Sequence, residues 1–177
     1  AALGAMGRRR EAPLMHLGLD LDLLDLTGLH HLLETGDVDL LQYVAVDDCG
    51  NKVNPLIVDG QVHGGVVQGI AQALYEEARY DDDGTLQSST LAEYLVPAAS
   101  DVPPITLGES ITPSPSNPLG VKGVGEAGTI GAAPCVMNAV VDALSGLGVQ
   151  DIQMPASPLN VWNAIQQAQA NHQETNQ

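Results

Sequence analysis

One glycine-rich segment with a single acid is the part of the sequence best suited to bind a ligand. Residues 120 to 131 read GVKGVGEAGTIG, and Glu126 is the only carboxylate among them. Glycines let a backbone bend sharply and lie close against a ligand. Glu126 itself is open to two interpretations. The dipole of a nearby helix start could favour its charge, which the residues alone favour, or it could be a general base whose pKa is raised in a water-poor pocket.

The same glycines satisfy a dinucleotide-binding pattern, but their context argues against it. Gly123, Gly125 and Gly128 match GxGxxG. That pattern must follow a buried strand, whereas residues 112 to 118 are rich in Pro and Ser and cannot form a central strand. A P-loop also fails, because Lys122 is followed by glycine instead of Ser or Thr. A nicotinamide or nucleotide-phosphate site is therefore disfavoured.

A second candidate surface lies on residues 61 to 78, whose apolar spacing predicts a helix. One face of this helix gathers amides and glycines: Gln61, Gly65, Gln68, Gly69 and Gln72. Glycine inside a helix costs up to about 1 kcal/mol relative to alanine, so its repetition on one face indicates the close approach of another body. That body could be a neighbouring helix or a bound ligand. The amides, which both donate and accept hydrogen bonds, slightly favour the ligand.

The remaining elements must bring these two surfaces together, and they mix helices with strands, so the predicted fold class is α+β. We predict strands over 41–46 and 149–154, and a hairpin turn at 81–84 with a returning strand over 86–90. Helices are predicted over 134–144 and from the Ser157–Pro158 pair onward. Residues 97 to 118 are rich in Pro, Ser and Thr and predict an extended connector.

The composition is that of one acidic globular domain. The 177 residues are 44% hydrophobic and only 3% aromatic, so Leu, Val, Ile and Ala must fill the core. The 22 acidic residues against 6 Lys and Arg give a net charge of -16, which disfavours nucleic acid and anionic membranes as partners. The Leu-rich residues 17 to 33 are interrupted by aspartates and cannot span a membrane. The basic run 8–10 is interpreted as a terminal patch, in preference to a targeting signal.

The two cysteines give no sign of a metal centre or a disulfide scaffold. Cys49 and Cys135 belong to no CxxC motif, and no His lies at a metal-ligand spacing from them. We expect buried free thiols in a cytoplasmic protein.

Four segments together resemble the C-terminal end of the molybdenum hydroxylase large subunit. They read YVAVDDCGNKVNPLIVDGQVHGGVVQGIAQALYEE, EYLVPAASDVPPI, TPSPSNPLGVKGVGEAGTIGAAP and NAVVDAL, in family-like order and spacing over about residues 34 to 166. That family includes xanthine dehydrogenase, aldehyde oxidases and aerobic carbon monoxide dehydrogenase. The resemblance implies a truncated molybdopterin-binding C-terminal domain over residues 34–177, preceded by a poorly matched segment, 1–33.

The resemblance also implies roles for particular residues. It implies a molybdenum held by the dithiolene of a pyranopterin cytosine dinucleotide, with no protein side chain as metal ligand. Glu126, in the GVGE motif, would be the active-site base beside the metal, which reverses the preference given above. The residues placed at the cofactor are Gln61, Lys122, Gly123, Val124 and Gly125. For Lys122, and for His63 of the GQVHGG segment, structural support is the favoured role.

Finally, the resemblance implies partners and an activity. The substrate would be carbon monoxide, an aldehyde or an N-heterocycle, with the first two favoured by the GQVHGG and TPSP segments. Oxygen would come from water, and electrons would leave through partner subunits that carry Fe-S clusters and FAD. Because the upstream part of the large subunit is missing, we expect the isolated chain to be inactive. Two alternatives stay open: a non-catalytic orphan domain that keeps the fold without the cofactor, and a stand-alone nucleotide-binding module.

Overall fold

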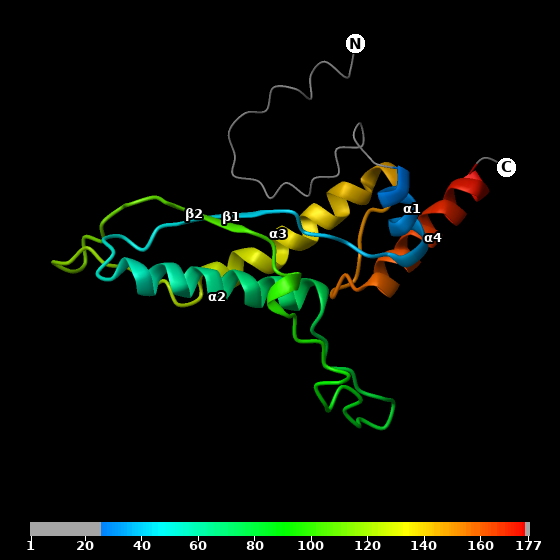
Figure 1. Cartoon of the computed structure of the whole chain (residues 1–177), viewed down its shortest axis with the longest axis horizontal. Coiled ribbons are helices and arrows are strands. Elements are labelled where there is room, and N and C mark those ends of the chain that lie inside the picture. The colour runs from blue at the N-terminus through cyan, green and yellow to red at the C-terminus, as the bar shows by residue number, and fades with distance from the viewer. Residues whose placement is uncertain (1–25, 176–177) are drawn as a thin grey trace, which may run out of the picture.

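The computed structural model describes residues 26 to 175, and the features noted within residues 1–25 lie outside that range. The described elements are both helical and extended, which confirms the predicted α+β class. In chain order they are α1 Leu26–Thr35, β1 Tyr43–Asp47, α2 Pro55–Leu74, η2 Ala99–Asp101, β2 Ile105–Glu109, α3 Ala127–Leu144, η3 Ser145–Leu147 and α4 Pro158–Thr175 (Figure 1). The boundary predicted between residues 33 and 34 falls inside α1 and stays a prediction.

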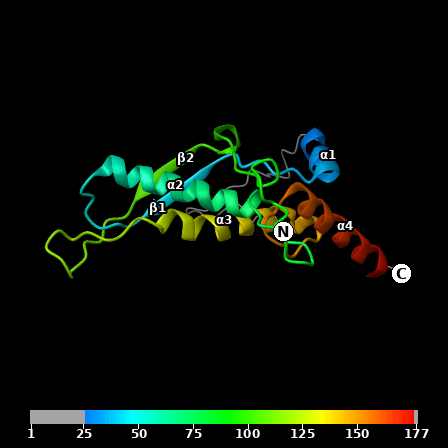
Figure 2. The ribbon, with the colours of Figure 1, turned by 90° about the horizontal axis from the view of Figure 1, so that it is seen from below.

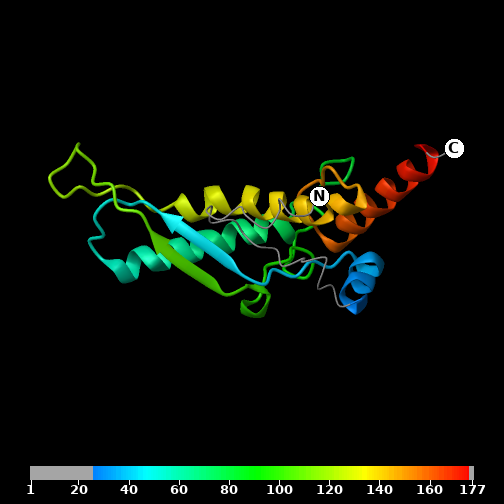
Figure 3. The same ribbon diagram turned by 90° about the horizontal axis from the view of Figure 1, so that it is seen from above.

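Helices α2 and α3 lie side by side and run in the same direction (Figures 1 and 3). Small residues make this contact. A Cβ atom at Gly65 would lie 2.9 Å from the backbone nitrogen of Thr129, and one at Gly128 would lie 2.9 Å from the backbone nitrogen of Val66. A Cβ at Gly69 would meet Ala132 and its neighbouring backbone. Only glycine lets the two backbones approach this closely.

The body that approaches the glycines of α2 is therefore the neighbouring helix α3. The hydroxyl of Thr129 strengthens the contact, since it donates to the carbonyl of Gly65 at 3.1 Å and lies 3.3 Å from the Gln68 side-chain oxygen. Gln61 and Gln72 are exposed, and Gln72 lines a hollow beside Thr129 and Ala133 of α3. The face predicted to be uniform is thus divided between buried glycines and exposed amides.

The start of α2 is set by a cap that lies upstream of the predicted start. Asn54 accepts a hydrogen bond from the Ile57 backbone nitrogen at 3.3 Å, and Pro55 occupies the first turn. This is the same kind of cap and proline pair that was recognised correctly at Ser157 and Pro158 of α4. The helix ends at Leu74, before the predicted end at residue 78. The acidic residues that follow Leu74 would place negative charge at the C-terminal end of a longer helix, where the helix dipole disfavours it.

Helix α3 also begins earlier than predicted, at Ala127 instead of Pro134. Pro134 lies inside the helix on an exposed face, next to the equally exposed Ile130. The Ile130 carbonyl, which loses its helical partner to the proline ring, can therefore bond to water. Gly128 looked like a loop residue in the sequence, but it is held in the helix by its contact with α2.

The sheet consists of two parallel strands joined by a crossover through α2. The register pairs Tyr43 with Ile105 and Asp47 with Glu109. Strand β1 confirms the strand predicted over 41–46, whereas β2 lies within residues 97–118, which were predicted to be an extended connector. Strand β1 runs along both helices (Figure 2), and its Tyr43 and Ala45 side chains join the core. The largest fully buried core side chains are those of Val66, Ile70, Val136, Val140, Leu144, Val161 and Ile165.

Two further strand predictions are wrong. The turn at 81–84 forms, with Asp81 accepting from the Thr85 nitrogen at 2.8 Å, but the pairing stops at one bridge between Tyr80 and Leu86. A two-stranded hairpin without further packing is only marginally stable, and these residues extend away from the rest of the fold (Figure 1). Residues 149–154 place Val149 and Ile152 in the core but pair with no other strand.

One helix in the described part of the chain, running through α3 from Ala127 to Leu147, is long and apolar enough to cross a membrane. This is weak evidence, because a core helix passes the same test. Here the helix packs through Gly128, Ala132 and Val136 against α2 and carries Asp142 on its surface.

The helix contact predicts opposite effects of alanine at two glycines of α2. We expect Gly69→Ala to lower the free energy of unfolding by about 1 to 3 kcal/mol, because the new methyl group overlaps α3. Gly64→Ala is the matched control: nothing lies within 4 Å of its Cβ position, so it should be neutral or stabilise the helix by up to about 1 kcal/mol. Urea unfolding of both variants measures the difference, and equal effects would contradict the close contact.

Candidate functional site

The entrance to the glycine segment is held by the turn that follows β1. The backbone nitrogen of Asn51 donates to the carbonyl of Gly120 at 3.2 Å, and the Asn51 side chain donates to Leu119 at 2.8 Å. Gly50 and Val121 form an isolated antiparallel bridge. We call this contact between residues 48–51 and residues 119–122 the crossing. Gly50 and Gly120 both have positive φ, 65° and 67°, so glycine suits both sides of the crossing.

Asp48 joins three segments at this crossing. One oxygen, Oδ1, accepts from the backbone nitrogens of Gly50 at 2.9 Å and Thr112 at 3.2 Å. The other oxygen, Oδ2, lies 2.9 Å from the Lys122 ammonium. These bonds hold the pKa of Asp48 well below its usual range. The bond from the Gly50 amide has the largest effect, and those from Lys122 and Thr112 come next. The sequence does not single out Asp48, because its partners Thr112 and Lys122 lie far away along the chain.

Both the backbone and the side chain of Lys122 are bonded to residues of the crossing. Its nitrogen donates to the Cys49 carbonyl at 2.8 Å, and its ammonium is paired with Asp48. These contacts favour structural support, the role preferred for Lys122 from the sequence. Contact of Lys122 with a cofactor stays a prediction.

Residues 123 to 125 form a short arch between two fixed ends. Lys122 is anchored at one end, and α3 begins directly after Glu126 at the other. Gly123 and Gly125 are exposed, and no atom lies within 4 Å of a Cβ position on either, whereas Val124 is half-buried and packs against the core. The backbone of this arch is therefore held in place by its neighbours yet open to another molecule.

Glu126 caps the start of α3 with its backbone. Its carbonyl accepts from the Ile130 nitrogen at 3.0 Å, whereas its side chain makes no capping hydrogen bond and is exposed. The helix predicted to begin near Pro134 with its free amides facing the loop thus begins inside the loop, directly after the acid. The charge at this position is favoured by the helix dipole, and the carboxylate is free to act on a ligand.

Gln61 lies at the same end of the helix pair as Glu126. It precedes Val62, whose carbonyl oxygen would lie 2.7 Å from a Cβ atom at Gly128 in the first turn of α3. Its side chain is exposed, as is that of His63, whose Nδ1 lies 2.8 Å from the Asp59 carbonyl. The fold therefore brings the predicted cofactor residues of α2 and of the arch to one end of the α2–α3 pair.

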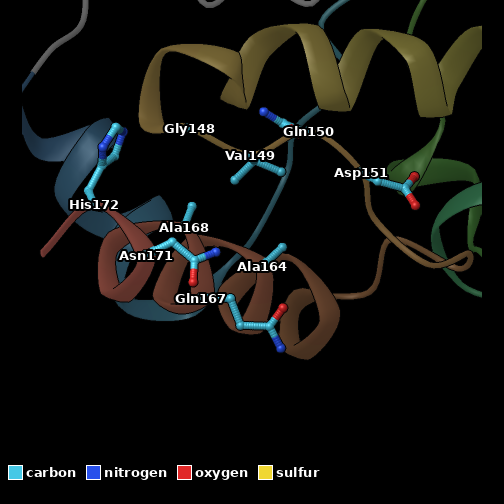
Figure 4. Close-up of a pocket in the computed structure, with 9 residues that line it drawn as sticks. All are labelled: Gly148, Val149, Gln150, Asp151, Ala164, Gln167, Ala168, Asn171 and His172. Atoms are coloured by element: carbon cyan, nitrogen blue, oxygen red, sulfur yellow. The ribbon is translucent and has the colours of Figure 1, made fainter. Parts of the chain in front are cut away.

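The hollows described on this chain lie elsewhere. One of about 400 Å³ lies between residues 148–151 and α4, lined by Ala164, Gln167, Ala168, Asn171 and His172 (Figure 4). A second, of about 680 Å³, lies along the outer face of α3, and a third, of about 640 Å³, lies beside Lys52 and β2. None of these three hollows is lined by Gln61 or Glu126, which are both exposed.

Between residues 26 and 175 no three His, Cys, Asp or Glu side chains are grouped so as to hold a metal ion. Cys49 is buried, as predicted, but Cys135 is only half-buried. Burial raises the pKa of the Tyr43 hydroxyl, and its hydrogen bond with Cys135 adds to this effect.

The crossing predicts different effects of alanine at two glycines of the loop. Gly120→Ala should lower the free energy of unfolding by about 1 to 2 kcal/mol, because its φ is positive and its Cβ would lie 2.8 Å from Asn51 Nδ2 and 2.9 Å from Pro113 Cβ. Gly123→Ala meets nothing within 4 Å and should change stability by less than about 0.5 kcal/mol. Thermal unfolding compares them; a Gly123 variant as unstable as the Gly120 variant would exclude an open arch.

The sequence has relatives among known molybdoenzymes. Residues 32–103 match the family of the molybdopterin cofactor-binding domain. The carbon monoxide dehydrogenase large chain of Hydrogenophaga pseudoflava is 38% identical over 133 residues, which are 75% of this chain and 17% of that one. The nicotine 6-hydroxylase large subunit of Paenarthrobacter nicotinovorans is 43% identical over 130 residues, which cover 73% of this chain and 16% of that one.

Solved structures give the same relationship. The Cu,Mo-CO dehydrogenase crystal structure matches with a TM-score of 0.75 and 38% identity, over 77% of this chain and 17% of that one. Quinoline 2-oxidoreductase from Pseudomonas putida 86 matches with a TM-score of 0.71 and 43% identity, over 75% of this chain and 17% of that one. The chain thus spans about one sixth of the length of these relatives. It belongs to the molybdenum hydroxylase large-subunit family and corresponds to part of the molybdopterin-binding region.

Proposed function

We propose that the arch 123–125, Gln61 and Glu126 form one wall of the active site of a molybdenum hydroxylase that oxidises a small substrate with oxygen from water. The observation that carries the proposal is their convergence at one end of the α2–α3 pair. The open backbone and the exposed carboxylate belong to elements that are otherwise firmly packed. A bound group held at this end would be contacted by a rigid surface.

The residues at this end suit a large polar cofactor. The bare backbone at Gly123 and Gly125 lets another molecule lie directly against peptide groups. The first amides of α3 have no helical partner and favour an anionic group. Gln61 offers both a donor and acceptors to a heterocycle or a phosphate. We therefore infer that this wall holds a molybdopterin cofactor, and specifically its cytosine dinucleotide form.

Glu126 supplies the proton chemistry in this proposal. The molybdenum centre, when bound, accepts the electrons removed from the substrate. Glu126 takes a proton from the water-derived nucleophile, and its place as the N-cap residue of α3 fixes its backbone and leaves the carboxylate outside the cap. Packing of the upstream part of the subunit over this end would exclude water and so strengthen the interaction of the Glu126 carboxylate with a bound group.

We propose carbon monoxide, an aldehyde or an N-heterocycle as the substrate, with Fe-S and FAD subunits as electron acceptors in a cytoplasmic complex. Relatives named for carbon monoxide and for nicotine and quinoline are about equally similar, at 38% and 43% identity. The GQVHGG and TPSP segments favour the carbon monoxide and aldehyde branch. The choice of substrate rests with residues upstream of this region.

The surface of the chain supports a role within a larger subunit. Two parallel strands are too few for a stable sheet, and parallel sheets are normally covered on both faces. Large apolar side chains are widely exposed, for example Leu56 at 83%, Leu91 at 81% and Ile130 at 70%. The same surface would leave an orphan domain poorly protected from aggregation, and this disfavours the non-catalytic alternative.

Metal content distinguishes the two functions. We expect the chain purified alone to contain no molybdenum, because only one wall of the site is present. Co-expressed with the upstream part of a related large subunit and with cofactor synthesis, the purified assembly should contain about one molybdenum per chain. Elemental analysis makes the measurement. An assembly that forms but stays free of molybdenum would favour the orphan domain.

The role of Glu126 is tested in that assembled enzyme. Glu126→Gln keeps the size of the side chain and removes the base, so kcat should fall by about 100-fold or more while molybdenum content stays near normal. The matched control is Glu77→Gln, which alters an exposed acid paired with Arg79 on the segment after α2. Retained turnover in the Glu126 variant would count against the base assignment.

A further inference from the structure

Asp48 lies outside the wall of predicted site residues but is bonded to the segment that carries them. We propose that Asp48 is a positioning residue: together with Lys122 it fixes the entrance of the arch 123–125, and so sets where the arch backbone meets the cofactor. This inference rests on the proposed function. Nothing in the sequence motifs assigned a role to Asp48 beyond a turn.

The geometry places the Asp48 carboxylate at the meeting point of three chain segments. Its own turn contributes the Gly50 amide, the connector after β2 contributes the Thr112 amide at 3.2 Å, and the glycine segment contributes the Lys122 ammonium at 2.9 Å. Both carboxylate oxygens are thus engaged by donors. Charge-assisted bonds of this kind are shorter and stronger than neutral ones.

The ion pair between Asp48 and Lys122 is partly shielded from water. The side chains of Asp48 and Lys122 are 27% and 35% exposed, so water screens them only in part. The lowered pKa of Asp48 keeps it ionised at every pH at which the enzyme could work. The chain has only 6 Lys and Arg against 22 acidic residues. One of these few cations, Lys122, is paired with Asp48.

The effect of this pair falls on the arch more than on Glu126. Glu126 is held by α3, which packs on α2 independently of the crossing. The arch spans only three residues between that helix and Lys122, and its two glycines have no side chains to hold them. Releasing Lys122 frees one end of the arch, and the backbone of residues 123 to 125 gains conformational freedom.

Hydrogen exchange in the whole 177-residue chain tests the first step without any cofactor. Asp48→Asn nearly preserves shape but loses the charge, and Lys122→Met removes the partner. Both variants should speed exchange of the amide at position 122, which donates to the Cys49 carbonyl at 2.8 Å, by about tenfold or more, with α3 amides such as that of Val136 unchanged. The matched control is Lys52→Met, which removes another paired lysine, held by Asp59 and Glu109 away from the arch. It should leave the exchange of the amide at position 122 unchanged.

Cofactor retention in the assembled enzyme tests the second step. Asp48→Asn should lose its cofactor several-fold faster on dilution, while turnover per bound molybdenum changes little. Unchanged exchange, or an equal increase over α3, would show a general cross-link and overturn the proposal. Selective loosening with unchanged retention would overturn it too. Either result leaves the Glu126→Gln test, and with it the proposed function, standing separately.

Discussion

The close contact between α2 and α3 is the constraint on which the rest of the structure depends. Gly65, Gly69 and Gly128 allow the two backbones to approach within the distance that a Cβ atom would fill. Because the contact sets both the separation and the relative position of the helices, it also sets which residues lie at their shared end. The sheet packs over the pair, and α4 joins the same core with Val161 and Ile165.

The crossing around Asp48 complements this contact. The helix pair fixes the chain from Glu126 onward, and the crossing fixes it up to Lys122, so the intervening arch is short, bare and anchored twice. Rigid ends and an open middle combine two needs of a cofactor site: accurate position and access to the backbone. The acid then follows the arch at a helix start, where its side chain has no capping role.

Much of this could be predicted from the sequence, and the failures have physical causes. The glycine segment, Glu126 and the glycine face of α2 were visible because residue type and spacing carry the signal. The start of α3 was not, since Gly128 and Pro134 are poor helix residues: the contact with α2 holds Gly128 in the helix, and the exposed position of Pro134 lets water bond the carbonyl that the proline leaves unpaired. Strand β2 was hidden by the neighbouring prolines, and Asp48 by partners that lie 64 and 74 residues away along the chain.

The two-stranded sheet has a consequence for the behaviour of the chain in solution. Among the described residues each strand has one neighbour, so each leaves an outer row of peptide groups without a strand partner. Such edges recruit strands from other molecules, and the exposed apolar side chains nearby would reinforce the pairing. Self-association through these edges would compete with correct assembly. Co-expression with a partner that covers the strand edges should therefore determine how much of the chain stays free of aggregates.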